Sequence, residues 1–124
     1  MTEGIKIGDR DMADLVSHLR LGRVRQVETI PARQGLVFHV QSNIGDFALK
    51  IVTEEERRAV RQQTDIEVRA FLAGVPTAEP IQLGPDAFLR TVHLAGKQLT
   101  AKVNVWTDRN WRRSNKSSAR VKWM

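Results

Sequence analysis

The stretch Phe47-Ala48-Leu49-Lys50 places a lysine inside an alternating strand pattern. Alternation puts Phe47 and Leu49 on one face of the strand, and Ala48 and Lys50 on the other. An ammonium on a packed face is costly to desolvate unless an anion partners it, and the compact charge of lysine suits phosphate oxygens. Lys50 is therefore a candidate phosphate-binding residue. The structural alternative is a lysine on an edge strand whose ammonium extends into water.

Glu67 is the candidate partner of Lys50. It lies in a predicted helix over residues 54–73, on a stripe formed by Val60, Gln63, Glu67, Ala70 and Phe71. A carboxylate at this position can turn towards the sheet and orient Lys50. However, Thr64-Asp65-Ile66-Glu67 also fits the capping-box pattern, in which Glu67 would satisfy a helix start at Thr64.

The rest of the chain predicts an α+β fold. A short amphipathic helix is expected over residues 11–21, capped by Asp9 or Asp11 and stopped by Gly22. Strands are expected over residues 24–30, 36–41 and 47–52, and, after the long helix and a proline-marked connector at 76–80, over residues 87–92 and 98–106. The connection between the second and third strands is short, which favours antiparallel pairing. We expect about five antiparallel strands, one packed helix and a short N-terminal helix.

Composition excludes several classes of protein. The chain has 124 residues, 41% of them hydrophobic, which predicts one folded domain and argues against wholesale disorder. It has no cysteine, which excludes disulfides and thiolate metal sites. No apolar run approaches the roughly 18 residues of a membrane span, so we expect a soluble, cytoplasmic protein. His18, His39 and His93 lack metal-ligand spacing and are expected to be structural.

The net charge of +6 is concentrated at the end of the chain. Residues 108–124 contain six arginines and lysines against the single acid Asp108, so the preceding part is nearly neutral. We predict a basic, disordered tail over residues 107–124 and consider nucleic acid an unlikely partner. The alternative hypothesis is a small binding module whose basic tail holds nucleic acid or an acidic protein, with Trp106, Trp111 and Trp123 among its cations.

Three stretches together resemble a known family. They are Gly35-Leu36-Val37-Phe38-His39-Val40 with Phe47-Ala48-Leu49-Lys50-Ile51, then Glu67-Val68-Arg69-Ala70-Phe71-Leu72 with the connector 74–81, then Leu99-Thr100-Ala101-Lys102-Val103-Asn104-Val105-Trp106. In order and spacing they resemble the N-terminal lobe of the aminoglycoside phosphotransferase and choline kinase superfamily, whose fold is similar to that of protein kinases. The resemblance implies that residues 1–106 form a kinase-like N-terminal lobe.

The resemblance also implies a set of ATP-binding residues. Lys50 would hold the phosphates and Glu67 would orient Lys50. Ala48 and Val37 would line the adenine, and the hinge near Asn104 and Trp106 would offer backbone hydrogen bonds to it. Gly35 would be the last glycine of the phosphate-covering loop, although by itself it is equally a turn residue.

The chain departs from the family in two respects. Ile30 and Ala32 stand where the loop's earlier glycines belong. The chain also stops 18 residues after Trp106, before the lobe that carries the catalytic Asp and the metal-binding Asn and Asp. We therefore expect a truncation, a fragment or a frameshifted product with little or no turnover. No catalytic or metal-binding residue is predicted, Mg²⁺ would need the missing lobe, and the small-molecule acceptor of the intact family stays unidentified.

Overall fold

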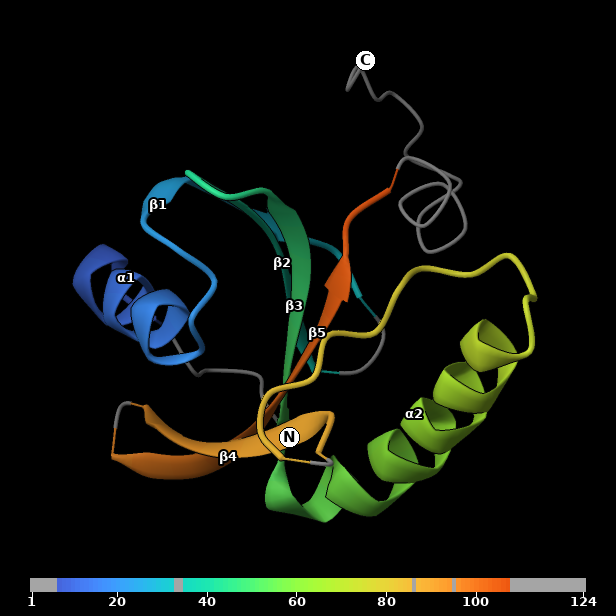
Figure 1. Ribbon diagram of the computed structural model, residues 1–124. Helices are drawn as coiled ribbons and strands as arrows, with labels where there is room; N and C mark the ends of the chain where they lie inside the picture. The colour runs from blue at the N-terminus through green and yellow to red at the C-terminus, as the bar shows by residue number, and fades with distance from the viewer. Residues whose placement is uncertain (1–6, 33–34, 86, 95, 108–124) are drawn as a thin grey trace.

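A five-stranded antiparallel sheet with two helices forms the protein, which confirms the predicted α+β class and antiparallel sheet. The computed structural model describes residues 7–32, 35–85, 87–94 and 96–107. The elements follow one another as α1 (Asp9–His18), β1 (Val24–Ile30), β2 (Leu36–Ser42), β3 (Asp46–Thr53), η1 (Glu54–Glu56), α2 (Arg57–Leu72), β4 (Leu89–Leu94) and β5 (Lys97–Val105). The strand order β1-β2-β3-β5-β4 makes β3 the middle strand (Figure 1).

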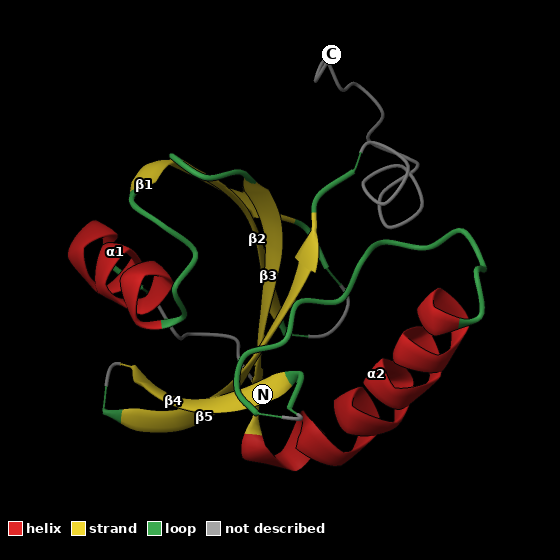
Figure 2. Cartoon of the chain, in the orientation of Figure 1, coloured by secondary structure: helices red, strands yellow, loops and turns green. Residues whose placement is uncertain are grey.

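The two helices lie on opposite sides of the sheet (Figure 2). The α1 side holds the main core, in which Met12, Leu15 and Val16 of the helix are buried. They belong to the same cluster as the alternate strand residues Phe38, Val40, Phe47, Leu49, Ile51, Leu99, Ala101 and Val103. Because side chains alternate along a strand, Ala48, Lys50 and Lys102 project from the other face, which is the side of α2.

The start and the end of α1 differ from the prediction. The helix begins at Asp9 with Gly8 as its N-cap, and no side chain caps it. The expected caps, Asp9 and Asp11, instead lie in the first turn, where their charge favours the helix dipole. The helix ends at His18 rather than at Gly22, and Arg20 takes the left-handed conformation, with φ of 61°.

The start of α2 decides between the two hypotheses for Glu67. A capping box does exist, but it belongs to Thr53 and Glu56, where Oε1 of Glu56 accepts from the Thr53 backbone N–H at 3.0 Å. Thr64 lies inside α2, and its hydroxyl donates to the Val60 carbonyl at 2.7 Å. The capping-box hypothesis for Thr64 and Glu67 is therefore wrong, and the Glu67 carboxylate is not used to cap its own helix.

The buried face of α2 is narrower than predicted. Its buried residues are Val60 and Thr64, whereas Gln63 is exposed and Phe71 is 38% exposed. The predicted stripe is therefore wrong at Gln63 and Phe71. Thr64 is buried instead, and its hydroxyl is bonded within the helix. Large apolar side chains are also exposed towards the end of α2 and beyond it, at Ile66, Leu72 and Val75. The second half of α2 thus contributes little apolar burial.

The connector after α2 runs beside the end of β5. Val105 donates its backbone N–H to the Glu79 carbonyl at 2.8 Å, and Ile81 donates to Val103 at 2.9 Å. The connector therefore lies on the same side of β5 as β4 and bonds to the part of β5 that β4 does not reach. β4 begins at Leu89, two residues later than predicted. Residues 108–124 lie outside the described part of the chain, so the disordered tail stays a prediction.

Gly35 offers a test of how tightly the start of β2 lies against β3. Its φ is 75°, and a Cβ there would lie 2.7 Å from the Ile51 carbonyl oxygen and 2.8 Å from Cγ1 of Val52. We expect G35A to lower the free energy of unfolding by about 2–5 kcal/mol, because a left-handed penalty and a steric one add. Denaturant unfolding measures this loss.

Gly96 supplies the matched control for that substitution. Its φ is 76°, but nothing lies within 4 Å of its Cβ position. G96A should therefore lose only about 1–2 kcal/mol, the left-handed penalty alone. Equal losses in the two variants would show that the close approach of Gly35 to β3 has no energetic weight.

Candidate functional site

Strand register brings the predicted site residues into two neighbouring rows on the α2 side of the sheet. In one row, Ala48 of β3 lies opposite His39 of β2 and Asn104 of β5. In the next row, Lys50 of β3 lies opposite Val37 of β2 and Lys102 of β5. Directly opposed residues on antiparallel strands have Cβ atoms about 4.5–5.5 Å apart and share a face. Val37, Ala48, Lys50 and Asn104 therefore do come together, as the sequence analysis expected.

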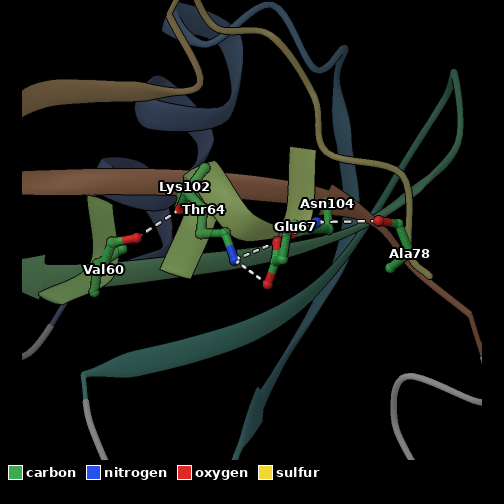
Figure 3. A network of polar contacts seen from close by, with 6 residues as sticks. All are labelled: Val60, Thr64, Glu67, Ala78, Lys102 and Asn104. Atoms are coloured by element: carbon green, nitrogen blue, oxygen red, sulfur yellow. Dashed lines mark hydrogen bonds and ion pairs between the residues drawn. The ribbon is translucent and has the colours of Figure 1, made fainter. Parts of the chain in front are cut away.

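Glu67 reaches down from α2 onto this face and is held there by two donors (Figure 3). Nζ of Lys102 lies 2.8 Å from Oε1 and 2.9 Å from Oε2 of Glu67. Nδ2 of Asn104 donates to Oε1 of Glu67 at 3.3 Å and lies 3.5 Å from the Ala78 carbonyl oxygen. The carboxylate thus turns inward as predicted, but it pairs with Lys102 and not with Lys50.

Lys50 stands beside this ion pair without joining it. In the part of the chain that the structure describes, its ammonium forms no ion pair or hydrogen bond. The side chain is half-buried and lies on the middle strand, so the edge-strand hypothesis is wrong. Glu67 is paired with Lys102, so among the described residues Lys50 is a cation on a packed face without a direct counter-ion.

The surroundings of Lys50 lower the pKa of its ammonium. Burial of the ammonium is the largest cause that lowers its pKa from the ordinary value of 10.5, and the charge of Lys102 acts in the same direction. Glu67 and then Glu56 act in the opposite direction without overcoming the first two. Glu56 is itself engaged by the backbone and hydroxyl of Thr53. An anion placed at the Lys50 ammonium would therefore relieve an unfavourable environment.

Two aromatic rings stack at the His39 end of the row formed by His39, Ala48 and Asn104. The Trp106 and His39 rings are stacked, with centroids 3.8 Å apart and planes 5° from parallel. His39 is 3% exposed, and its Nε2 lies 3.1 Å from Oδ2 of Asp46. His39 is thus a buried residue with a carboxylate partner, and the Trp106 ring lies beside the row that contains Ala48.

The backbone at the predicted hinge is partly occupied. Val105 donates its N–H to Glu79, and Trp106 donates its N–H to the Asp46 carbonyl at 3.1 Å. These two N–H groups are therefore not donors for an adenine edge. The expectation that the backbone from Asn104 to Trp106 supplies hydrogen bonds to a base therefore does not hold for the N–H groups of Val105 and Trp106.

Lys102 is the residue that the sequence analysis missed. It is 8% exposed and lies directly opposite Lys50. A signal for it was present, because Thr100, Lys102 and Asn104 alternate with apolar residues along β5 and so share its non-core face.

Gly35, by contrast, approaches the β3 backbone at Ile51, which gives it a structural role whether or not its loop covers phosphate.

Comparison with protein-family models, curated proteins and solved structures found no match to this chain. Within the described residues, no helix is long and apolar enough to cross a bilayer. The same residues contain no group of three or more His, Cys, Asp or Glu side chains suited to a metal ion.

Removing the Lys102 ammonium should destabilise the protein. Glu67 would lose its partner while its side chain stays only 34% exposed. A fully buried broken pair costs about 3–5 kcal/mol, and partial solvation of Glu67 reduces this, so we expect K102M to lose about 1–3 kcal/mol. Denaturant unfolding provides the measurement, with the exposed Lys97 of the same strand as control. K97M should change stability by less than about 0.5 kcal/mol, and an equally small effect of K102M would contradict a stabilising pair.

Removing the Lys50 ammonium should have the opposite effect on stability. Its pKa is lower in the folded protein than in the unfolded chain. The unfolded chain therefore binds more protons between those two values, and stability rises with pH across that window. We expect K50M to be more stable than the wild type at neutral pH and to lack this alkaline rise, as measured by unfolding at a series of pH values. A K50M protein that is less stable at neutral pH would show that Lys50 has a stabilising partner.

Proposed function

We propose that this chain is the ATP-binding N-terminal lobe of a small-molecule phosphotransferase, related to the aminoglycoside phosphotransferase and choline kinase superfamily. The observation that carries the proposal is the ammonium of Lys50 on the middle strand, which has no ion pair or hydrogen bond within the described ranges and lies on the same face as an inward-turned carboxylate of α2. Strained or unfavourable placement of a charge is more frequent at functional sites than elsewhere. An arrangement that costs stability is understandable when a ligand anion completes it.

The topology supports the same proposal. Three antiparallel strands, an inserted helix and two further strands occur in the order that the resemblance implies. Lys50 lies on the third strand, and the helix that follows that strand supplies Glu67. These positions match the strand lysine and helix glutamate of kinase-like folds. The departure is that Glu67 pairs with Lys102.

In this proposal the two rows of the sheet divide the nucleotide between them. Lys50 receives the phosphates, whose charge its ammonium balances, and Val37, which lies opposite Lys50 on β2, lines the side of the adenine as the resemblance implies. The row with Ala48 receives the base, because the small side chain of Ala48 leaves space above the sheet. Ligands for Mg²⁺, the catalytic base and the acceptor site would come from a second lobe, which would supply the phosphoryl-transfer chemistry.

A nucleotide titration tests this division. We expect K50M to bind ATP about 10- to 100-fold more weakly than the wild type, because it loses a charge-assisted contact to phosphate. Adenosine, which lacks phosphate, should bind both proteins equally. Isothermal titration calorimetry or amide chemical-shift titration measures both ligands. K97M is the matched control, since it removes an exposed lysine from β5 at the same change in net charge.

Two outcomes would contradict the proposal. If the wild type binds neither ATP nor adenosine, the face does not hold a nucleotide. If K50M and K97M bind ATP with equal affinity, ATP binds elsewhere or only through net charge. Shifts at Val37, Ala48 and Lys50 in the wild-type titration would locate the ligand directly.

A further inference from the structure

The side of α2 that faces away from the sheet carries a stripe of side chains that no described part of the chain covers (Figure 2). Its members recur every three or four residues, the spacing that places side chains on one face of a helix. The exposed residues at this spacing, called here the outer stripe, are Arg58, Arg61, Gln62, Asp65, Ile66, Arg69 and Leu72. The outer stripe therefore lies on the opposite side of α2 from the nucleotide face.

The first half of the outer stripe is cationic. Within the described residues, the side chains of Arg58, Arg61 and Arg69 form no hydrogen bond or ion pair. Arg58 and Arg61 line a hollow of about 410 Å³, and cations near the start of a helix oppose its dipole. Guanidinium groups bind carboxylates through two parallel hydrogen bonds. This half of the stripe is therefore suited to the acidic side chains of a partner.

The second half of the outer stripe is apolar and continues just beyond the helix. Ile66 is 66% exposed, Leu72 is 77% exposed, and Val75, three residues later, is 50% exposed. Large apolar side chains that gather on a surface mark sites of interaction. About 21 Å of helix axis separates Arg58 from Leu72. A partner that covers both halves must therefore span about four helical turns.

Charge and apolar exposure argue against three other occupants. Residues 108–124 carry six arginines and lysines against one acid, which is the same sign of charge as the arginines of the stripe. On a second copy, the exposed large apolar residue outside this region is Ile44 among the described residues, and it shares a hollow with Arg20 and Arg23. Nucleic acid would bind the arginines, but the stripe has no aromatic ring on which bases stack.

We propose that the outer stripe of α2 docks an acidic amphipathic helix of another protein, whose carboxylates bind Arg58 and Arg61 and whose apolar side chains cover Leu72. A helix fits better than an extended strand, because a helix surface offers no unpaired backbone groups to a strand, whereas two helices pack through their side-chain ridges. This interaction goes beyond nucleotide binding, since the two surfaces lie on opposite sides of α2.

A peptide selection tests the proposal. The bait is the full chain, and the library displays random peptides of about 16 residues, long enough for four helical turns. We expect the enriched peptides to combine Asp or Glu with Leu, Ile or Phe. The same peptides, synthesised and labelled, are then titrated by fluorescence anisotropy. R58Q/R61Q and L72Q should each bind them about tenfold more weakly than the wild type, through lost ion pairs and lost apolar burial respectively.

Two matched controls remove the same groups elsewhere on the surface. R23Q/R25Q removes two exposed arginines at the start of β1, and I44Q removes an exposed isoleucine from the turn between β2 and β3. Both variants should bind the peptides within about twofold of the wild type, because surface substitutions away from the docking site leave it intact. L72Q should bind ATP as the wild type does, because Leu72 faces away from the nucleotide face.

The outcomes separate this inference from the proposed function. The absence of enriched peptides, or peptides that bind L72Q and R58Q/R61Q as tightly as the wild type, would overturn the docking surface. Binding of single-stranded DNA or of phosphatidylserine vesicles that is lost in the same variants would assign the stripe to nucleic acid or to a membrane instead. Loss of ATP affinity in L72Q would place the stripe in the nucleotide site and overturn its separate role. If the wild type binds the peptides but not ATP, the proposed function alone fails.

Discussion

The contact between Lys102 and Glu67 is the constraint on which the non-core face of the sheet depends. Lys102 is deeply buried on β5, and an ammonium in that position without a carboxylate would cost several kcal/mol. Glu67 supplies both oxygens to it and so fixes the rotation of α2 about its own axis. Apolar packing alone would fix α2 less well, because its buried residues are Val60 and Thr64.

That same contact makes Lys50 locally unfavourable. Two lysines face one another across adjacent strands, and only one of them has the carboxylate. Like charges placed directly opposite in a sheet destabilise it. A folded protein retains such a pair most readily when something else requires it, which is why local conflicts of this kind point to function. The protein's main core lies on the opposite face and is unaffected by this cost.

Sequence patterns predicted the parts of the fold that depend on local periodicity. Alternation located β2 and β3 and placed Lys50 on the face away from Phe47 and Leu49, because side chains along a strand must alternate. The inward orientation of Glu67 and the burial of Val60 followed from helical spacing, but the expected burial of Gln63 and Phe71 did not. Thr64 was a candidate helix start, yet it lies buried inside α2, where its hydroxyl donates to the Val60 carbonyl.

The pairing of Glu67 could not be predicted in the same way. It depends on β5 lying next to β3 in the register that opposes Lys102 to Lys50. That register joins segments separated by a helix, a connector and β4, so no local spacing encodes it. Periodicity placed Lys50 and Glu67 on this face, but the carboxylate pairs with Lys102, which is the more deeply buried of the two lysines.

One amide group links parts of the chain that otherwise lie far apart in sequence. Nδ2 of Asn104 lies near both the Glu67 carboxylate on α2 and the Ala78 carbonyl in the connector (Figure 3). A tilt of α2 that withdrew Glu67 would remove one of the two contacts of the Asn104 amide. The connector, which holds the other contact, is also bonded to the end of β5 through the Val105 N–H. Asn104 therefore links the position of α2 to the connector and, through it, to the strand end beside Trp106.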